Sequence, residues 1–175
     1  SGGDPLVQSK ESQYRVAILV SSGKDDREKA VYGALDAALS DNLSKFAFFS
    51  IVERSNLGAL AKEQNIETLN DDELATVDIP KADYLITARL STATLRAVPL
   101  MKGSYQGKVQ VDYRFYEKVG NRVIATKNIE GASSSYVRVE GDQDADKVLK
   151  DPAATAILVE AAQETAKAFA VELGK

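Results

Sequence analysis

The sequence contains neither histidine nor cysteine, so its reactive side chains are carboxylates, hydroxyls, lysine, tyrosine and arginine. This composition excludes Ser-His-Asp and Cys-His catalysis, the usual zinc sites, haem and iron–sulfur ligation, and disulfide bonds. An enzyme that works with carboxylates alone, such as a glycosidase, stays as one hypothesis. Glu53 and Asp112 could form its acid–base pair, but nothing in the sequence brings them together. We predict no catalytic residue, no metal site and no cofactor.

Two short motifs imitate ligand sites. The Ser-Gly-Lys sequence at 22–24 stands where a phosphate-binding loop would, but such a loop needs a further glycine at the position of Ile18. The aspartates at 142, 144 and 146 have the spacing that begins a calcium-binding loop, yet the central glycine and the closing glutamate are missing. We interpret the first motif as a turn before a helix cap and the second as a solvated loop.

Length and composition indicate one globular domain. The chain has 175 residues, of which 44% are hydrophobic and 27% charged, values that exclude a wholly disordered protein. Its net charge is −4, and because nucleic-acid binding needs a basic footprint, we predict no nucleic-acid partner. No stretch reaches the roughly 20 apolar residues of a membrane helix. We expect membrane contact only through a lipid anchor that this chain does not contain.

The hydrophobic pattern of the first half predicts alternating strands and helices. Residues 1–13 are small and polar and indicate a flexible tail, and residues 14–175 indicate a single domain. The run 15–20 (RVAILV) is apolar on both faces, which is typical of a central strand covered on both sides. The elements predicted next are a helix over 25–43 capped by Asp25 or Asp26, a strand over 46–52 and a short helix over 55–65.

The second half predicts antiparallel strands and a closing helix. A long strand begins at 82, and residues 108–116 alternate between apolar and polar side chains, as in a half-buried strand. Gly120 and Asn121 suit a hairpin turn before strands over 123–129 and 133–139, and a helix begins at Pro152. The predicted fold class is α/β (α+β): a mixed sheet with antiparallel C-terminal hairpin strands, packed by helices.

The polar side of the 105–116 strand is the predicted interaction surface. Tyrosines beside such a row are interface candidates, because tyrosine offers a large contact area at a low entropic cost. The alternative is that they are core residues, as we expect for Tyr113. The predicted interface consists of Tyr105, Lys108, Gln110, Arg114, Tyr116 and Tyr136.

Two segments resemble a known family. Residues 48–64 (FFSIVERSNLGALAKEQ) resemble the "VVER…L..LL.EQ" signature of the CsgG/LpoB group of bacterial envelope lipoproteins, and residues 82–88 (ADYLITA) resemble that group's "ADYLVTG" strand start. Ala61 replaces the second leucine of a pair and Ala88 stands where glycine is common, which leaves the subfamily open. The resemblance implies a TolB N-terminal-like fold. The structural residues of the two motifs are Val52, Glu53, Arg54, Leu57, Leu60, Glu63, Gln64, Ala82, Asp83 and Tyr84.

The resemblance implies a role in binding or assembly, without catalysis. LpoB-like members are outer-membrane lipoproteins that activate a peptidoglycan synthase, whereas CsgG-like members form an outer-membrane secretion pore for curli. We expect a non-enzymatic periplasmic lipoprotein domain, anchored to the outer membrane, that binds another envelope protein, such as a penicillin-binding protein, or itself. The alternative is a subunit of a CsgG-like secretion or assembly complex. The polar row Lys108, Gln110 and Asp112 argues against a lipid-facing hairpin.

Overall fold

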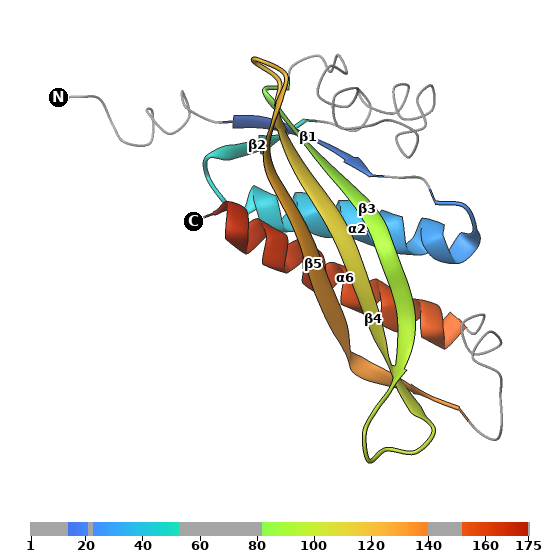
Figure 1. Ribbon diagram of the computed structural model, residues 1–175. Helices are drawn as coiled ribbons and strands as arrows, with labels where there is room; N and C mark the ends of the chain where they lie inside the picture. Colours follow the sequence, from blue (N-terminus) through green and yellow to red (C-terminus); the bar gives the residue numbers. More distant parts are fainter. Residues whose placement is uncertain (1–13, 21–22, 53–81, 140–151, 175) are drawn as a thin grey trace.

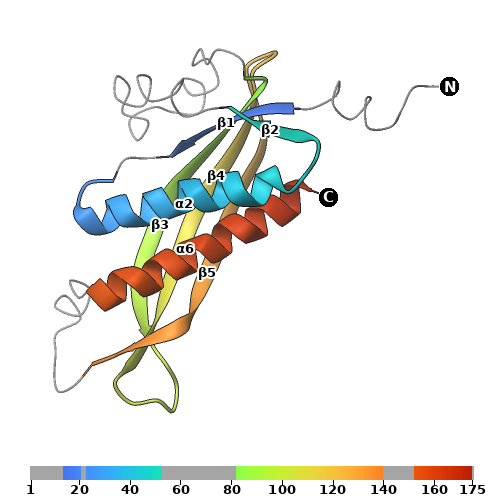
Figure 2. The same ribbon diagram turned by 180° about the vertical axis from the view of Figure 1, so that it is seen from behind.

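A computed structural model describes residues 14–20, 23–52, 82–139 and 152–174, and the structural statements below concern these residues. They form a curled five-stranded sheet with two helices side by side on one of its faces (Figures 1 and 2). The strand order is β2-β1-β3-β4-β5. The elements are β1 (Tyr14–Val20), α2 (Asp26–Ser44), β2 (Phe49–Ile51), β3 (Tyr84–Ala97), β4 (Ser104–Glu117), β5 (Arg122–Arg138) and α6 (Pro152–Leu173).

The sheet is mixed, as the sequence predicts. β1 is parallel to both of its neighbours, with Val16 opposite Ile51 of β2 and opposite Tyr84 of β3. β3, β4 and β5 then follow one another as antiparallel strands. The parallel pairs need long connections, whereas the antiparallel pairs need only short turns. β5 therefore forms one edge of the sheet and the short β2 forms the other.

β1 is buried on both faces, which confirms the prediction for the run 15–20. Val16 and Ile18 belong to the main core on the helix side, while Ala17 and Leu19 point to the opposite face. All four side chains are at most 6% exposed. Leu85 of β3 pairs with Ala17 and is also completely buried.

α2 begins where the sequence predicts. The Asp25 carboxylate accepts a hydrogen bond from the Glu28 backbone N–H at 2.8 Å, which caps the helix. Leu35, Leu39 and Leu43 recur at helical spacing and are fully buried against the sheet. The helix thus buries one apolar stripe beside α6 (Figure 2).

α6 packs very closely on β4 and β5 because two glycines face it. A Cβ on Gly107 would lie 2.7 Å from the Ile157 carbonyl oxygen, and a Cβ on Gly131 would lie 2.4 Å from that of Ala161. Further along α6, the Tyr113 ring stacks on Phe169 with a centroid distance of 4.3 Å. The Tyr113 and Thr165 hydroxyls are 2.7 Å apart. Tyr113 is a core residue, as predicted.

Several predicted boundaries differ from the structure. β2 covers only 49–51, because residues 46–48 form a turn in which the Phe49 N–H donates to the Phe46 carbonyl. The two predicted strands over 123–139 form one strand, β5. The predicted tail over 1–13, the short helix over 55–65 and the aspartates between 142 and 146 lie outside the described residues.

Candidate functional site

The sheet has one polar, solvent-facing region on the side away from the helices. Residues that pair directly across antiparallel strands point to the same face, so the register defines this region. Thr92, Gln110 and Glu130 form one cross-strand row, and Arg96, Gln106 and Tyr136 form another. We call this surface the open face. It consists of Thr92, Thr94, Arg96, Gln106, Lys108, Gln110, Glu130 and Tyr136.

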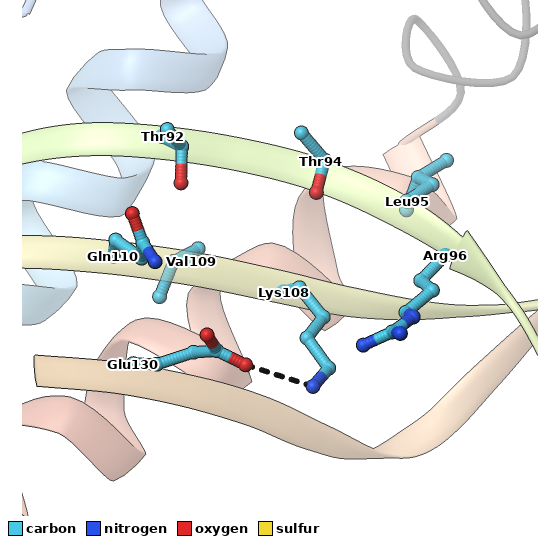
Figure 3. A pocket seen from close by; sticks show the side chains of 8 residues that line it. All are labelled: Thr92, Thr94, Leu95, Arg96, Lys108, Val109, Gln110 and Glu130. Atoms are coloured by element: carbon cyan, nitrogen blue, oxygen red, sulfur yellow. Dashed lines mark hydrogen bonds and ion pairs between the residues drawn. The ribbon is translucent and has the colours of Figure 1, made fainter.

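A hollow of about 460 Å³ lies in the open face and is open to solvent. Figure 3 shows the side chains that line it, which come from three adjacent strands. Six of the lining residues are polar or charged, and the other two, Val109 and Leu95, pack on the helix side of the sheet. The lining consists of Thr92, Thr94, Leu95, Arg96, Lys108, Val109, Gln110 and Glu130.

One ion pair organises the hollow. The Lys108 ammonium nitrogen lies 2.9 Å from a Glu130 carboxylate oxygen (Figure 3). This hydrogen bond, together with the charge of Lys108, lowers the pKa of Glu130, and the Gln110 amide and the charge of Arg96 act in the same direction. Glu130 is therefore ionised at neutral pH, and Lys108 lies between it and Arg96 (Figure 3).

The structure brings only part of the predicted interface together. Lys108 and Gln110 line the hollow, and Tyr136, which is 49% exposed, lies on the same face opposite Gln106. Arg114 lies further along β4, opposite Thr87 and Thr126. Lys108, Gln110 and Tyr136 therefore share the open face, and Arg114 lies outside the hollow.

The prediction for Tyr116 was wrong, and Tyr105 lies apart from the open face. Tyr116 is completely buried and pairs with the equally buried Leu85. This end of the sheet is buried on both faces, so facing away from the helices does not expose a side chain there. Tyr105 pairs with Val137 and packs, half-buried, in a small apolar cluster with Val137 and Ile157. It therefore lies on the helix side of the sheet.

Four polar residues of the hollow were not predicted from the sequence. Thr92, Thr94 and Arg96 alternate with Ala93 and Leu95, so the period-two pattern of β4 extends to β3. That pattern could have placed all three polar side chains on one face. Glu130 had no comparable signal, because its position depends on how β5 pairs with β4.

The described residues of the two family motifs have structural roles. Asp83 forms a two-pronged ion pair with Arg15, with N–O distances of 2.9 and 3.0 Å. The Arg15 side chain thereby lowers the pKa of Asp83. Tyr84 stacks edge-to-face on Tyr14, and the Val52 N–H donates to the Val16 carbonyl. Ala82 directly precedes Asp83 of this ion pair. The other motif residues lie outside the described residues: Glu53, Arg54, Leu57, Leu60, Glu63 and Gln64.

The fold is shared with solved bacterial proteins. The hypothetical protein CT253 of Chlamydia trachomatis is similar over 93% of this chain and 94% of its own, with 12% identity and a TM-score of 0.52. A homologue of neuraminyllactose-binding hemagglutinin from Helicobacter pylori is similar over 95% and 85%, with 14% identity and a TM-score of 0.51. The lipoprotein GNA1162 of Neisseria meningitidis has a TM-score of 0.49 at 10% identity over 92% and 98%.

The sequence comparison defines the family. The model of the CsgG family, described as curli production assembly/transport component CsgG, matches residues 7–94, just over half of the chain. The chain belongs to the CsgG family, which agrees with the resemblance seen in its motifs. No curated protein matches the sequence. Neither described helix is long and apolar enough to cross a membrane.

Proposed function

We propose that this domain is a non-enzymatic module of the bacterial envelope that binds another envelope protein through its open face. One observation carries this proposal. The two helices cover one face of the sheet, whereas β3, β4 and β5 leave exposed polar side chains and Tyr136 on the other (Figure 1). A sheet face that carries charged, amide, hydroxyl and aromatic groups resembles the polar surfaces of transient interfaces.

The resemblance of the motifs to the CsgG/LpoB group supports a location and a partner class. We propose that the domain works in the periplasm, held at the outer membrane as a lipoprotein, because the motifs resemble the CsgG/LpoB group. In that group, the LpoB-like members activate a peptidoglycan synthase. The partner that we propose is therefore a penicillin-binding protein, and the domain would act on it by binding alone.

Site-specific photo-crosslinking tests the proposed surface. A photoreactive amino acid is placed at Gln110 or Tyr136 in the complete lipoprotein, with Lys29 on α2 as the control position, and the proteins are crosslinked in living cells. We expect an envelope protein to be captured from positions 110 and 136 but not from position 29. Equal capture from all three positions, or none from 110 and 136, would contradict the proposal.

A second candidate function is assembly with copies of itself, as in a CsgG-like complex. The observation that favours it is the outer edge of β5, a strand of 17 residues that pairs only with β4 among the described strands and exposes Val123 and Ile124 by 38% and 46%. Exposed edge strands of this length offer unpaired backbone groups to another strand. Light scattering across a hundredfold concentration range tests this function, which predicts a mass that rises above 18.9 kDa in discrete multiples.

A further inference from the structure

We propose that the hollow in the open face binds a carboxylate side chain from an acidic segment of the partner protein. This inference rests on the proposed function, because it names the chemistry of the partner that the open face would recognise. It goes further in that it assigns the recognition to particular donors, with Arg96 as the principal one.

The charges of the hollow favour an anion. Its lining contains two cations, Arg96 and Lys108, and one carboxylate, Glu130, so one positive charge is in excess. Glu130 is engaged by Lys108 at 2.9 Å. Among the described residues, the exposed Arg96 guanidinium makes no hydrogen bond or ion pair, although its charge acts on Glu130. Arg96 is thus the cation that an incoming carboxylate can engage.

The chemistry of these groups suits a carboxylate in particular. A guanidinium presents parallel N–H donors whose spacing matches the two oxygens of a carboxylate. Figure 3 shows Arg96 of β3 reaching toward Lys108 of β4, with Thr94 and Thr92 further along β3 itself. These two hydroxyls add neutral donors beside the cations. The sequence from 90 to 111 contains no aspartate or glutamate, so the carboxylate in the lining of the hollow is Glu130 of β5, which Lys108 engages.

The shape of the hollow favours a protein segment over a free small acid. Sites for small molecules bury most of the ligand surface, whereas this hollow is open to solvent. A free acid would leave most of its surface in water and would bind weakly. A carboxylate on a larger partner gains the remaining contact from the surrounding rows, which continue through Gln106 to Tyr136. The net charge of −4 also disfavours acidic segments elsewhere on the molecule.

A short acidic peptide tests the recognition directly. The probe is a hexaglutamate peptide with blocked ends, and backbone amide shifts are followed by NMR at low ionic strength. We expect saturable shifts at Thr92, Thr94, Arg96, Lys108 and Gln110. We expect none with hexaglutamine, and at least tenfold weaker binding with acetate at the same carboxylate concentration. Shifts confined to other parts of the chain, or equal affinity for acetate, would overturn the proposal.

Three substitutions separate recognition from general charge effects. Arg96→Gln should weaken hexaglutamate binding at least tenfold, and Glu130→Gln should strengthen it severalfold because Lys108 becomes free. Arg27→Gln, which removes the same charge from α2 on the other side of the sheet, should change the affinity less than twofold. An equal loss in the Arg96 and Arg27 variants, or weaker binding by Glu130→Gln, would count against the hollow.

The two proposals can fail separately. If crosslinking from position 110 captures a partner but hexaglutamate does not bind in the hollow, the open face is an interface that uses other chemistry. If hexaglutamate binds at Arg96 but no partner is captured, the hollow recognises carboxylates and the proposed function fails.

Discussion

The hydroxyl pair in the core has a defined direction. The Thr165 hydroxyl donates its single hydrogen to the Ala162 carbonyl at 2.7 Å, so the Tyr113 hydroxyl must donate to Thr165 across their 2.7 Å contact. Burial raises the pKa of Tyr113 well above its ordinary value, which keeps the phenol protonated and able to donate. Tyr113 therefore needs Thr165 as its acceptor, whereas Thr165 keeps its hydrogen bond to Ala162 without Tyr113.

This direction predicts unequal costs of substitution. Thr165→Val strands the buried Tyr113 O–H group and should lower the free energy of unfolding by about 1–3 kcal/mol, whereas Tyr113→Phe leaves Thr165 bonded to Ala162 and should cost about 1 kcal/mol or less. In a Tyr113→Phe background, Thr165→Val should lower the free energy of unfolding by less than it does in the unchanged protein. Urea unfolding of the four proteins measures these differences, and equal costs would contradict the assigned direction.

Leu100 has a backbone conformation that is unfavourable for its residue type. It lies at the tip between β3 and β4, has a φ of +66° and is fully exposed. The left-handed region costs a leucine roughly 1 kcal/mol, whereas asparagine tolerates it.

Leu100→Asn should therefore raise the free energy of unfolding by about 0.5–1 kcal/mol. Asn121 has a φ of +49° in the next turn and serves as the reverse control. Asn121→Leu should lower stability by a similar amount, as measured by urea unfolding. If Leu100→Asn is neutral while Asn121→Leu is costly, the tip does not hold Leu100 under strain.

At the level of elements, the approach of α6 to the sheet depends on glycine. A Cβ on Gly131 would lie 2.4 Å from the Ala161 carbonyl oxygen and 2.6 Å from the Thr165 methyl group, so this position has no room for a side chain. A Cβ on Gly33 of α2, by contrast, would have nothing within 4 Å. The two glycines form a matched pair for the same substitution.

Gly131→Ala should lower the free energy of unfolding by about 1–3 kcal/mol, because α6 must move away from β5. Gly33→Ala should raise it by roughly 0.5–1 kcal/mol, because alanine favours the helix. Thermal unfolding of both variants provides the measurement. A neutral Gly131→Ala would mean that α6 can shift without losing its packing.

The elements show what a single sequence can predict. The alternation of β4 correctly placed Val109, Val111 and Tyr113 inside, and the Gly120 turn and the Asp25 cap follow from local chemistry. Local chemistry does not tell which end of a sheet is buried on both faces. For this reason the buried Tyr116 was wrongly predicted to be an interface residue. The hollow was found only in part, because Glu130 reaches Lys108 through a pairing register with shifts at two points along β4.

At the scale of the whole molecule, the free energy of unfolding should fall at acidic pH but change little between pH 5 and 8. The chain has no histidine, so no side chain has an ordinary pKa between 5 and 8. Three described carboxyl groups, Asp83, Glu130 and Glu160, have lowered pKa values, caused first by hydrogen bonds from Arg15, Lys108 and Ser134 respectively. A lowered pKa in the folded state gives stability that is present above the unfolded pKa and lost as the pH falls through the folded one.

Glu160 offers the clearest test of this dependence. One of its carboxylate oxygens accepts hydrogen bonds from the backbone N–H groups of Ser134 and Ser135, at 2.6 and 3.2 Å, and joins α6 to β5. Because the group is only partly buried, Glu160→Gln should cost only about 0.5–1 kcal/mol at pH 7. The difference from the unchanged protein should shrink as the pH falls below 4.5, the ordinary value for this group.

Urea unfolding at pH 7, 5, 3.5 and 2.5 measures the effect. Asp83→Asn should follow the same course, with its difference fading below pH 3.8. A control is Lys29→Gln on α2, which touches none of these carboxyl groups and should follow the unchanged protein at every pH. A Glu160→Gln difference that persists unchanged at pH 2.5 would show that the contact does not depend on the charge.

The length of β3 sets how far this domain can extend from a point of attachment. Tyr14, where the described chain enters the sheet, touches Tyr84 at the start of β3, and the tip that carries Leu100 follows its end at Ala97. Fourteen residues of strand span on the order of 45 Å. Both views show the hairpin continuing past the helices (Figures 1 and 2). If the domain is held at its Tyr14 end, the hairpin extends rigidly away from that point. The hollow then lies partway along the hairpin, and the exposed Leu100 lies at its tip.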